Sequence, residues 1–291
     1  MGKEERNKTI MKHNILKGFI LAMVFGIIIF CASGSHSIAN EPHRPEIHCK
    51  HFIYGIPLGT PITNDLIIRD IYAMSSNDST KFADWVAYRL DVETVVGNAK
   101  TERVWKSDPF LADEETLEPE DYKGAYKALN TDRGHQAPLA SFKGTRYWNQ
   151  TNYLSNITPQ KSALNRGPWR ILEGKVRAFV KANRVGYVLT GPLYEKSMPK
   201  LPGADEAHRV PSAYWKIFIY NEESKDISSL MTASFIFPQD TPSKANILDY
   251  LVTIDEVEKR SCFDVLWELP DNIEGKVESI LNAEWAKEYF R

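Results

Sequence analysis

The chain has 291 residues, of which 43 % are hydrophobic and 25 % charged. This composition is that of a globular protein and excludes a largely disordered chain. Residues 1–39 carry a net charge of +3 and the whole chain −2, so the remainder carries −5. A protein that is basic throughout is thereby excluded, and any contact with a polyanion requires a local basic surface.

The first 39 residues have the layout of a secretory signal peptide. A basic start is followed by an apolar run over residues 15–31 and by the small residues Ser37 and Ala39. This order predicts cleavage after Ala39 and export to the periplasm or the medium. The alternative is an uncleaved membrane anchor, because the apolar run is long for a signal. Residues 40–291 are expected to form the folded domain.

The elements that follow alternate without a regular βαβ rhythm. Residues 40–57 are expected to be irregular, and residues 105–131, rich in Asp, Glu and Pro, to form a long surface loop with short helical turns. The residue patterns predict strands over 85–90, 187–190, 213–220 and 233–237, and helices over 168–183, 254–260 and 275–290. This arrangement favours an α+β fold with a mainly antiparallel sheet.

The cysteines do not form a disulfide framework. The chain contains only Cys31, Cys49 and Cys262. Cleavage after Ala39 would leave two, which could pair, but two cysteines cannot replace a packed core.

A first candidate site is the run Asp132-Arg133-Gly134-His135. Histidine titrates near neutral pH and can take a proton from water, and arginine offers a planar fork to phosphate oxygens. Glycine allows close approach of the backbone. The alternative is a structural histidine, which is the more common role of a histidine taken alone.

A second candidate site follows in the chain. Asn156 precedes Asn165, and Glu173 and Arg177 come eight and twelve residues after Asn165. On a regular helix these offsets correspond to turns of about 80° and 120°, so the three side chains can share one side. Glu173 and Arg177 can also pair. The alternative is a capping asparagine with an ordinary surface ion pair.

Residues 160–184 form a basic segment with a net charge of +6. Its candidates for contacts to a substrate are Lys161, Arg166 and Arg170. The alternative is a solvated helix face.

Two stretches, residues 132–140 (DRGHQAPLA) and 152–173 (NYLSNITPQKSALNRGPWRILE), resemble the DNA/RNA non-specific endonucleases of the ββα-metal class. The likeness covers roughly residues 50–270 and includes residues 81–88, 105–109, 190–195, 211–216 and 252–260. It implies the ββα-metal (His-Me finger) nuclease fold, in which helices flank a central, mainly antiparallel sheet.

The resemblance also implies a role for each matching residue. His135 corresponds to the general base, and Asn165 to the sole protein ligand of one Mg²⁺, for which Mn²⁺ can substitute. Glu173 corresponds to the carboxylate that orients water at the metal. Arg103 corresponds to the arginine that steadies the phosphate, with support from Arg133, Asn156 and Arg177.

The implied activity is hydrolysis of DNA and RNA, single- or double-stranded and without sequence specificity, to products with 5′-phosphates. Contacts to phosphate carry no sequence information, which fits this breadth. The resemblance also suggests a homodimer, and membrane contact would arise only through an uncleaved leader. The chain departs from the family at cysteine positions, which look like Phe52, Ile56 and Leu248 here.

Three other functions remain open at this point. One is a nucleic-acid-binding module that has lost catalysis, which the intact candidate residues disfavour. Another is a specialised nuclease of the same fold, such as a toxin with an immunity partner or an enzyme confined to DNA. The third is an envelope-anchored structural protein, which leaves the motif unexplained.

Overall fold

The structure is a computed structural model that describes residues 47–98, 103–182, 184–221 and 227–291. The predicted signal peptide, its cleavage site and Cys31 lie outside these residues. All the described residues belong to one compact unit.

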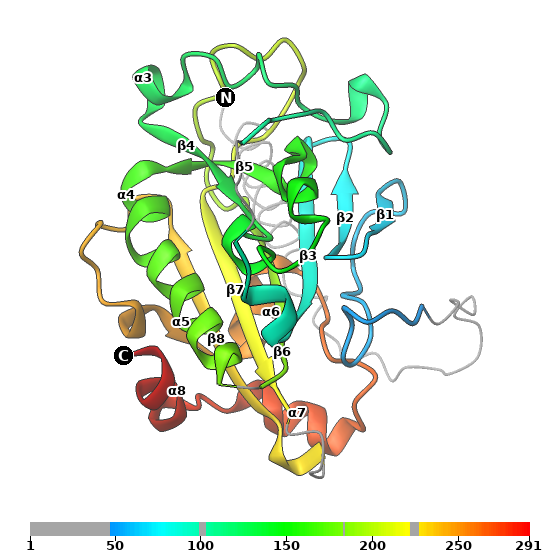
Figure 1. Ribbon diagram of the computed structural model, residues 1–291, viewed down its shortest axis with the longest axis vertical. Helices are drawn as coiled ribbons and strands as arrows, with labels where there is room; N and C mark the ends of the chain where they lie inside the picture. The colour runs from blue at the N-terminus through cyan, green and yellow to red at the C-terminus, as the bar shows by residue number, and fades with distance from the viewer. Residues whose placement is uncertain (1–46, 99–102, 183, 222–226) are drawn as a thin grey trace, which may run out of the picture. The chain divides into compact units, whose positions relative to one another are not determined.

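A seven-stranded sheet forms the centre of this unit (Figure 1). Every neighbouring pair of strands in it is antiparallel. In spatial order the strands are β1 (Asp65–Ile68), β2 (Ala73–Asn77), β3 (Phe82–Leu90), β6 (Gly186–Leu193), β7 (Ala213–Tyr220), β8 (Met231–Pro238) and β9 (Leu251–Val252). The α+β class with a mainly antiparallel sheet is therefore confirmed.

Alternation along the strands places an apolar layer on each face of the sheet. On β7, Tyr214 and Phe218 belong to one buried cluster, whereas Trp215, Ile217 and Ile219 belong to the other. Because successive side chains of a strand point to opposite faces, a strand buried on both faces must be apolar almost throughout.

Helices cover both layers. The first layer contains α5 (Arg170–Lys181) and α8 (Ala283–Phe290), and α5 crosses the sheet in the view of Figure 1. The second contains α6 (Ile254–Ser261), whose Ile254 and Val257 are buried, and α7 (Asp271–Ser279), whose Val277 packs against it. Leu172, Val176, Phe179 and Val180 of α5 are buried, and each contributes about 1.5–3 kcal/mol. The remaining short helices are α2 (Val92–Val95), α3 (Ala125–Leu129) and α4 (Ser162–Leu164).

A separate two-stranded ribbon leads into α5. It consists of β4 (Thr131–His135) and β5 (Ile157–Lys161), which pair antiparallel with His135 opposite Ile157. Between α4 and α5 the chain turns at Gly167, whose backbone is not helical (φ −99°, ψ −117°). A Cβ at this position would lie 2.5 Å from the carbonyl oxygen of Ser243, so only glycine fits. The order β4, β5, α5 gives the ββα unit.

Most of the elements predicted from sequence are present, with differences in detail. The strand over 187–190 continues through Gly191 and Pro192 to Leu193. The single helix predicted over 275–290 is wrong, because the chain leaves helical geometry between α7 and α8. There Asn282 Nδ2 donates a hydrogen bond to the Thr232 carbonyl at 3.1 Å.

The two cysteines of the described residues, Cys49 and Cys262, are both free, so the pairing considered above does not occur. Helices long and apolar enough to cross a membrane are absent from the described part of the chain.

Candidate active site

A cavity of about 640 Å³ opens where the end of β4 meets the start of α5. Its walls come from four places in the sequence, namely the 103–105 segment, the 122–126 region, β4 with the turn after it, and the Asn165–Arg177 stretch. The lining residues with polar or aromatic side chains are Arg103, Trp105, Tyr122, Tyr126, Thr131, Asp132, Arg133, His135, Asn165, Arg166, Arg170, Glu173 and Arg177.

Strand β4 fixes the position of His135. A Cβ on Gly134 would lie 2.6 Å from Gln160 Cβ, so the glycine allows the two strands of the ribbon to approach closely. His135 Nε2 lies 3.3 Å from Asn152 Oδ1, and its ring packs against Trp105 with centroids 5.4 Å apart. With the amide oxygen as acceptor, Nε2 carries the proton and Nδ1 keeps its lone pair.

The electrostatic surroundings of His135 favour the neutral ring. Burial lowers the pKa of His135 to about 4, the positive charge of Arg103 adds to this effect, and the Asn152 hydrogen bond opposes it. A neutral imidazole at pH 7 is the form that can accept a proton.

Asp132 holds the side chain of Asn165. Asn165 Nδ2 donates to Asp132 Oδ2 at 2.9 Å, and Arg166 donates to both carboxylate oxygens of Asp132 at 2.8 and 2.6 Å. Burial disfavours the Asp132 anion, yet these hydrogen bonds lower its pKa. Because the amide nitrogen of Asn165 is engaged, its Oδ1 oxygen is the atom left to bind a cation, and no hydrogen bond reaches it from the described residues.

Glu173 lies in the first turn of α5 above a buried lysine. Burial raises the pKa of Glu173, while the charges of Lys216 and Arg177 act in the opposite direction. Lys216 is 1 % exposed, its Nζ lies 3.3 Å from the Tyr88 hydroxyl and 4.5 Å from the centroid of the Trp169 ring. No ion pair joins Glu173 to Arg177 within the described residues, although both line the cavity.

Two arginines bring unpartnered donors to the cavity. Arg133 stacks on Trp105 and Tyr122, with its guanidinium carbon 5.4 and 5.1 Å from the two ring centroids. Its Nη2 donates to the Pro119 carbonyl at 2.8 Å, but its buried Nε has no partner within the described residues. Nη1 of Arg177 is buried without a partner in the same way. Buried donors of this kind indicate a missing acceptor.

Two of the candidate residues do not line the cavity. Asn156 is completely buried and accepts from Ala137 N at 2.8 Å, while its Nδ2 donates to the carbonyls of Ala137 (3.0 Å) and Thr151 (2.9 Å). It therefore fixes the turn after His135. Lys161 donates to the Leu129 carbonyl at the end of β5, away from the lining.

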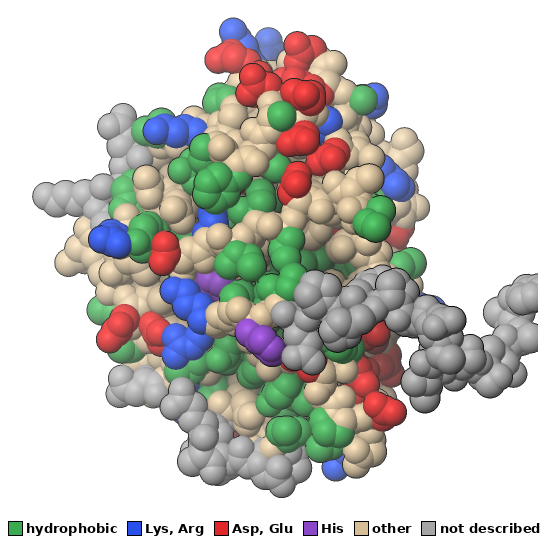
Figure 2. Space-filling model, turned by 90° about the vertical axis from the view of Figure 1, so that its right-hand side faces the viewer, with side chains coloured by type: hydrophobic (Ala, Val, Ile, Leu, Met, Phe, Trp, Pro, Cys, Tyr) green, Lys and Arg blue, Asp and Glu red, His purple; other side chains and the backbone are tan. Residues whose placement is uncertain are grey.

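The basic segment 160–184 does not form one surface. Arg166, Arg170 and Arg177 line the cavity, whereas Lys175 bonds the carbonyl of Arg291. Arg184 lies over the rings of Phe179 and Tyr289. Acidic side chains gather at the end of the molecule where residues 105–131 lie (Figure 2).

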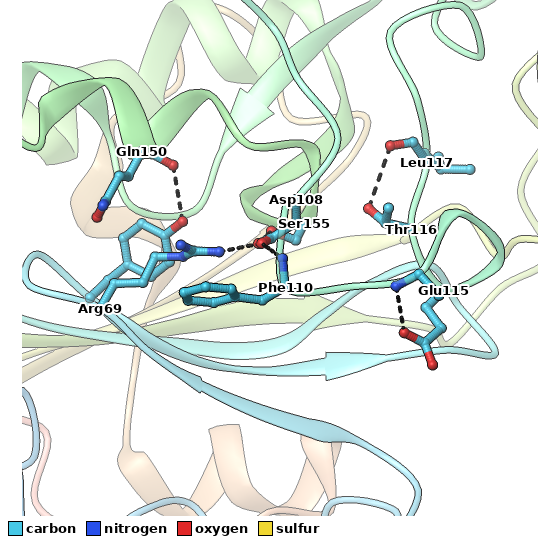
Figure 3. Close-up of polar contacts among 10 residues, drawn as sticks. Arg69, Asp108, Phe110, Glu115, Thr116, Leu117, Gln150 and Ser155 are labelled. Carbon is cyan, nitrogen blue, oxygen red and sulfur yellow. Dashed lines mark hydrogen bonds and ion pairs between the residues drawn. The ribbon is translucent and has the colours of Figure 1, made fainter.

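A buried ion pair anchors the segment that carries Trp105. Arg69 donates to Asp108, whose other oxygen accepts from Ser155, and Phe110 N donates to Asp108 at 3.0 Å (Figure 3). The Arg69 guanidinium lies 4.3 Å from the ring centroid of Phe110 and 4.7 Å from that of Tyr153. This anchor was not among the features predicted from the sequence, and Trp105, Asn152 and Lys216 were not among the predicted site residues. Of these, only Lys216 leaves a signal, as the single charge in the apolar run AYWKIFIY.

The oxygen donors of the cavity fit a hard divalent cation. Asn165 Oδ1 and the Glu173 carboxylate line it, and neither sulfur nor imidazole joins them except His135, whose Nε2 is engaged by Asn152. Magnesium prefers oxygen ligands, few of them from protein, with water completing the shell.

The fold and this cavity define a nuclease of the ββα-metal class. A solved structure described as the EndoG/EndoGI complex has a similar fold, with a TM-score of 0.58 and 24 % identity over 73 % of this chain and 89 % of that one. The sequence model of the DNA/RNA non-specific endonuclease family matches residues 52–272. The chain therefore belongs to this family of metal-dependent nucleic-acid hydrolases, and the family inferred from the motifs is confirmed.

Curated relatives agree with this assignment. The nuclease of Serratia marcescens is 46 % identical over 77 % of this chain and 83 % of its own length. A nuclease of Nostoc sp. is 30 % identical over 89 % of this chain and 96 % of its own length. The human mitochondrial endonuclease G is 28 % identical over 70 % of both chains.

Proposed function

We propose that this chain is an endonuclease that hydrolyses DNA and RNA to products with 5′-phosphates, with His135 as general base and one Mg²⁺ as cofactor. The observation that carries the proposal is a pair of buried guanidinium nitrogen atoms, Arg133 Nε and Arg177 Nη1, that find no acceptor among the described residues and belong to the cavity that holds a neutral histidine. A phosphodiester supplies the acceptors that these donors lack.

His135 would activate the nucleophile. Its Nδ1 lone pair can take a proton from a water in line with the scissile P–O bond, while Asn152 holds the ring through Nε2. Because the pKa of His135 lies near 4, the base is unprotonated at neutral pH.

Arginines would bind and neutralise the phosphate. Arg103, Arg133 and Arg177 approach the cavity from three different segments, so they can surround a phosphoryl group whose charge grows in the transition state. Asn156 would support the site indirectly, by holding the turn that follows His135.

Asn165 Oδ1 would hold the cation, with Mn²⁺ as a possible substitute for Mg²⁺. When bound, the cation supplies positive charge beside the scissile phosphate and the leaving 3′-oxygen. Glu173 would accept hydrogen bonds from water in the cavity and so orient the proton donor for the leaving oxygen.

The substrate range would follow from contacts to the backbone alone. Arg166 and Arg170 lie on the α5 side of the cavity, whereas acidic side chains gather over residues 105–131 (Figure 2), so the polyanion would run along α5. Phosphate contacts do not distinguish sequences, and the same set can bind single or double strands. Lys161 would attract the polyanion through its positive charge without contacting it directly.

Export rests on residues 1–39, which we propose as a signal peptide that directs the chain to the periplasm or medium, with a membrane anchor if it is not cleaved. Residues 40–291 would then be the mature endonuclease. A homodimer is proposed from the family resemblance.

A cleavage assay on plasmid DNA and on RNA, with Mg²⁺ or with EDTA, tests the activity. His135→Ala should lower kcat about 10²–10⁴-fold with folding retained, because proton transfer to a positioned base contributes that much. The exposed His48, outside the cavity, provides the matched control His48→Ala. Cleavage that resists EDTA, or near-normal turnover by His135→Ala, would overturn the proposal.

A further inference from the structure

Three carboxylates converge where α6 meets α7. Asp255 and Glu258 lie on α6 and Glu278 near the end of α7, and each offers an oxygen within 4.8 Å of the others. None of them lines the cavity described above. The group is therefore separate from the candidate active site.

Glu278 is the residue in this group that requires an explanation. It is 7 % exposed, and its Oε1 is buried without a hydrogen-bond partner among the described residues. It also lies in the last turn of α7, where the helix dipole disfavours a negative charge. A buried carboxyl oxygen without a partner is costly, and the Glu278 carboxylate lies beside two further carboxylates.

Within the described residues, no ion pair joins a lysine or arginine to Asp255, Glu258 or Glu278. The neighbouring cations of α6 pair elsewhere, Lys259 with Glu256 and Arg260 with Glu195. Burial and the charges of the surrounding carboxylates, which include Asp264 and Glu274, raise the pKa of Glu278 to about 8 and that of Glu258 to about 7. A cation at this point would remove the repulsion.

We propose that Asp255, Glu258 and Glu278 bind a divalent cation, Ca²⁺ in preference to Mg²⁺, and that this cation joins α6 to α7. Calcium accepts several carboxylates in irregular geometry, whereas magnesium keeps most of its waters and takes one or two. Glu258 Oε1 already accepts from Val265 N at 2.8 Å, which fixes its carboxylate at the start of the α6–α7 connection. The cation stabilises the fold and does not enter the reaction.

The test is thermal unfolding of EDTA-treated, dialysed full chain at pH 7.5 with and without CaCl₂. The wild type should gain about 5 °C or more in Tm at 100 times the Kd. Glu278→Gln and Asp255→Asn should lose this gain. Because Glu278→Gln removes repulsion, it should be at least as stable as the wild type without Ca²⁺. The exposed Glu284, which pairs with Lys287, provides the control Glu284→Gln, which should keep the gain.

A second variant separates this site from the candidate active site. Asn165→Ala removes the proposed ligand in the cavity and should keep the Ca²⁺-dependent rise in Tm. Glu278→Gln should keep Mg²⁺-dependent cleavage. If the rise disappears in Asn165→Ala and persists in Glu278→Gln, the cation acts only at the active site and the proposal is wrong. No rise in the wild type would also overturn it.

Discussion

At the scale of single residues, the candidate site depends on a lysine that takes no direct part in it. Lys216 belongs to the face of β7 that points toward α5, and it lies beneath Glu173 with Trp169 and Tyr88 around its ammonium group. Burial lowers the pKa of Lys216, and the Glu173 charge opposes that effect. Because each charge supports the other, Lys216 lowers the pKa of Glu173 against the effect of burial and so favours its ionised form.

Lys216→Met should therefore raise the pKa of Glu173 and move the acid limb of the kcat/KM profile to higher pH. A shift of about one pH unit corresponds to about tenfold lower activity below the limb, with recovery above it. The free energy of unfolding should also fall, because the substitution removes one charge of a buried, mutually supporting pair, so the profile is measured at a temperature where the variant stays folded. Lys175→Met, outside the cavity lining, is the control for loss of charge on α5, and an unchanged profile for Lys216→Met would contradict the proposed role of Lys216.

At the scale of elements, sequence patterns predicted four strands of the sheet (β3, β6, β7 and β8) and the helices α5 and α6, and they missed β1, β2, β9 and the ribbon. β7 and α5 have clear apolar periods, so both were predicted close to their observed bounds. β4 and β5 were not predicted as strands. They contain Gly134, Pro159 and many polar side chains, so their sequences show no alternation of apolar residues. Pairing in a two-stranded ribbon is decided by contacts that a single segment does not show.

The kink before α5 is another feature that the sequence pattern did not predict, and it lies within the candidate site. Helical spacing placed Asn165, Glu173 and Arg177 on one side, but Gly167 interrupts that helix. The three side chains still meet in one cavity, because the turn and the Asp132 hydrogen bond set the direction of Asn165. The residues of the motif could be predicted from the sequence. The contacts with Trp105, Asn152 and Asp108 could not, because they depend on tertiary packing between distant segments.

One prediction concerns the connection between the sheet and the segment before β4. Asp108→Ala leaves Arg69, with a side chain 3 % exposed, as an unpaired buried charge. Loss of one partner of a buried pair costs about 3–5 kcal/mol, so urea unfolding should show a drop of that size. Glu284→Ala, at an exposed pair, should cost about 0–1 kcal/mol. Equal losses at the two sites would show that the pair does not anchor the segment.

At the scale of the whole molecule, two buried groups give the stability opposite dependences on pH. His51 connects the N-terminal part of the described chain to the sheet: Nε2 donates to the Arg69 carbonyl at 2.8 Å, and Nδ1 accepts from Arg89 N at 3.4 Å. The Nδ1 contact requires the neutral ring, because a protonated Nδ1 has no lone pair to accept with, whereas Nε2 can donate in either form. The carboxylates between α6 and α7 have raised pKa values. Without a cation, the stability that their protonated forms contribute to the fold is therefore lost as pH rises toward 7–8.

The His51 contribution can be isolated by comparing variants across pH. Burial lowers the pKa of His51 from 6.5 to about 4, so the unfolded chain binds more protons in this window and stability falls as pH decreases through it. The full loss is about 3 kcal/mol. His51→Gln should be less stable at pH 7 and show a flatter slope of unfolding free energy between pH 6.5 and 4, measured in urea. The carboxylates act equally in both proteins, so the difference between their curves reports His51 alone. Parallel curves for His51→Gln and wild type would exclude His51 as the acid-sensitive group.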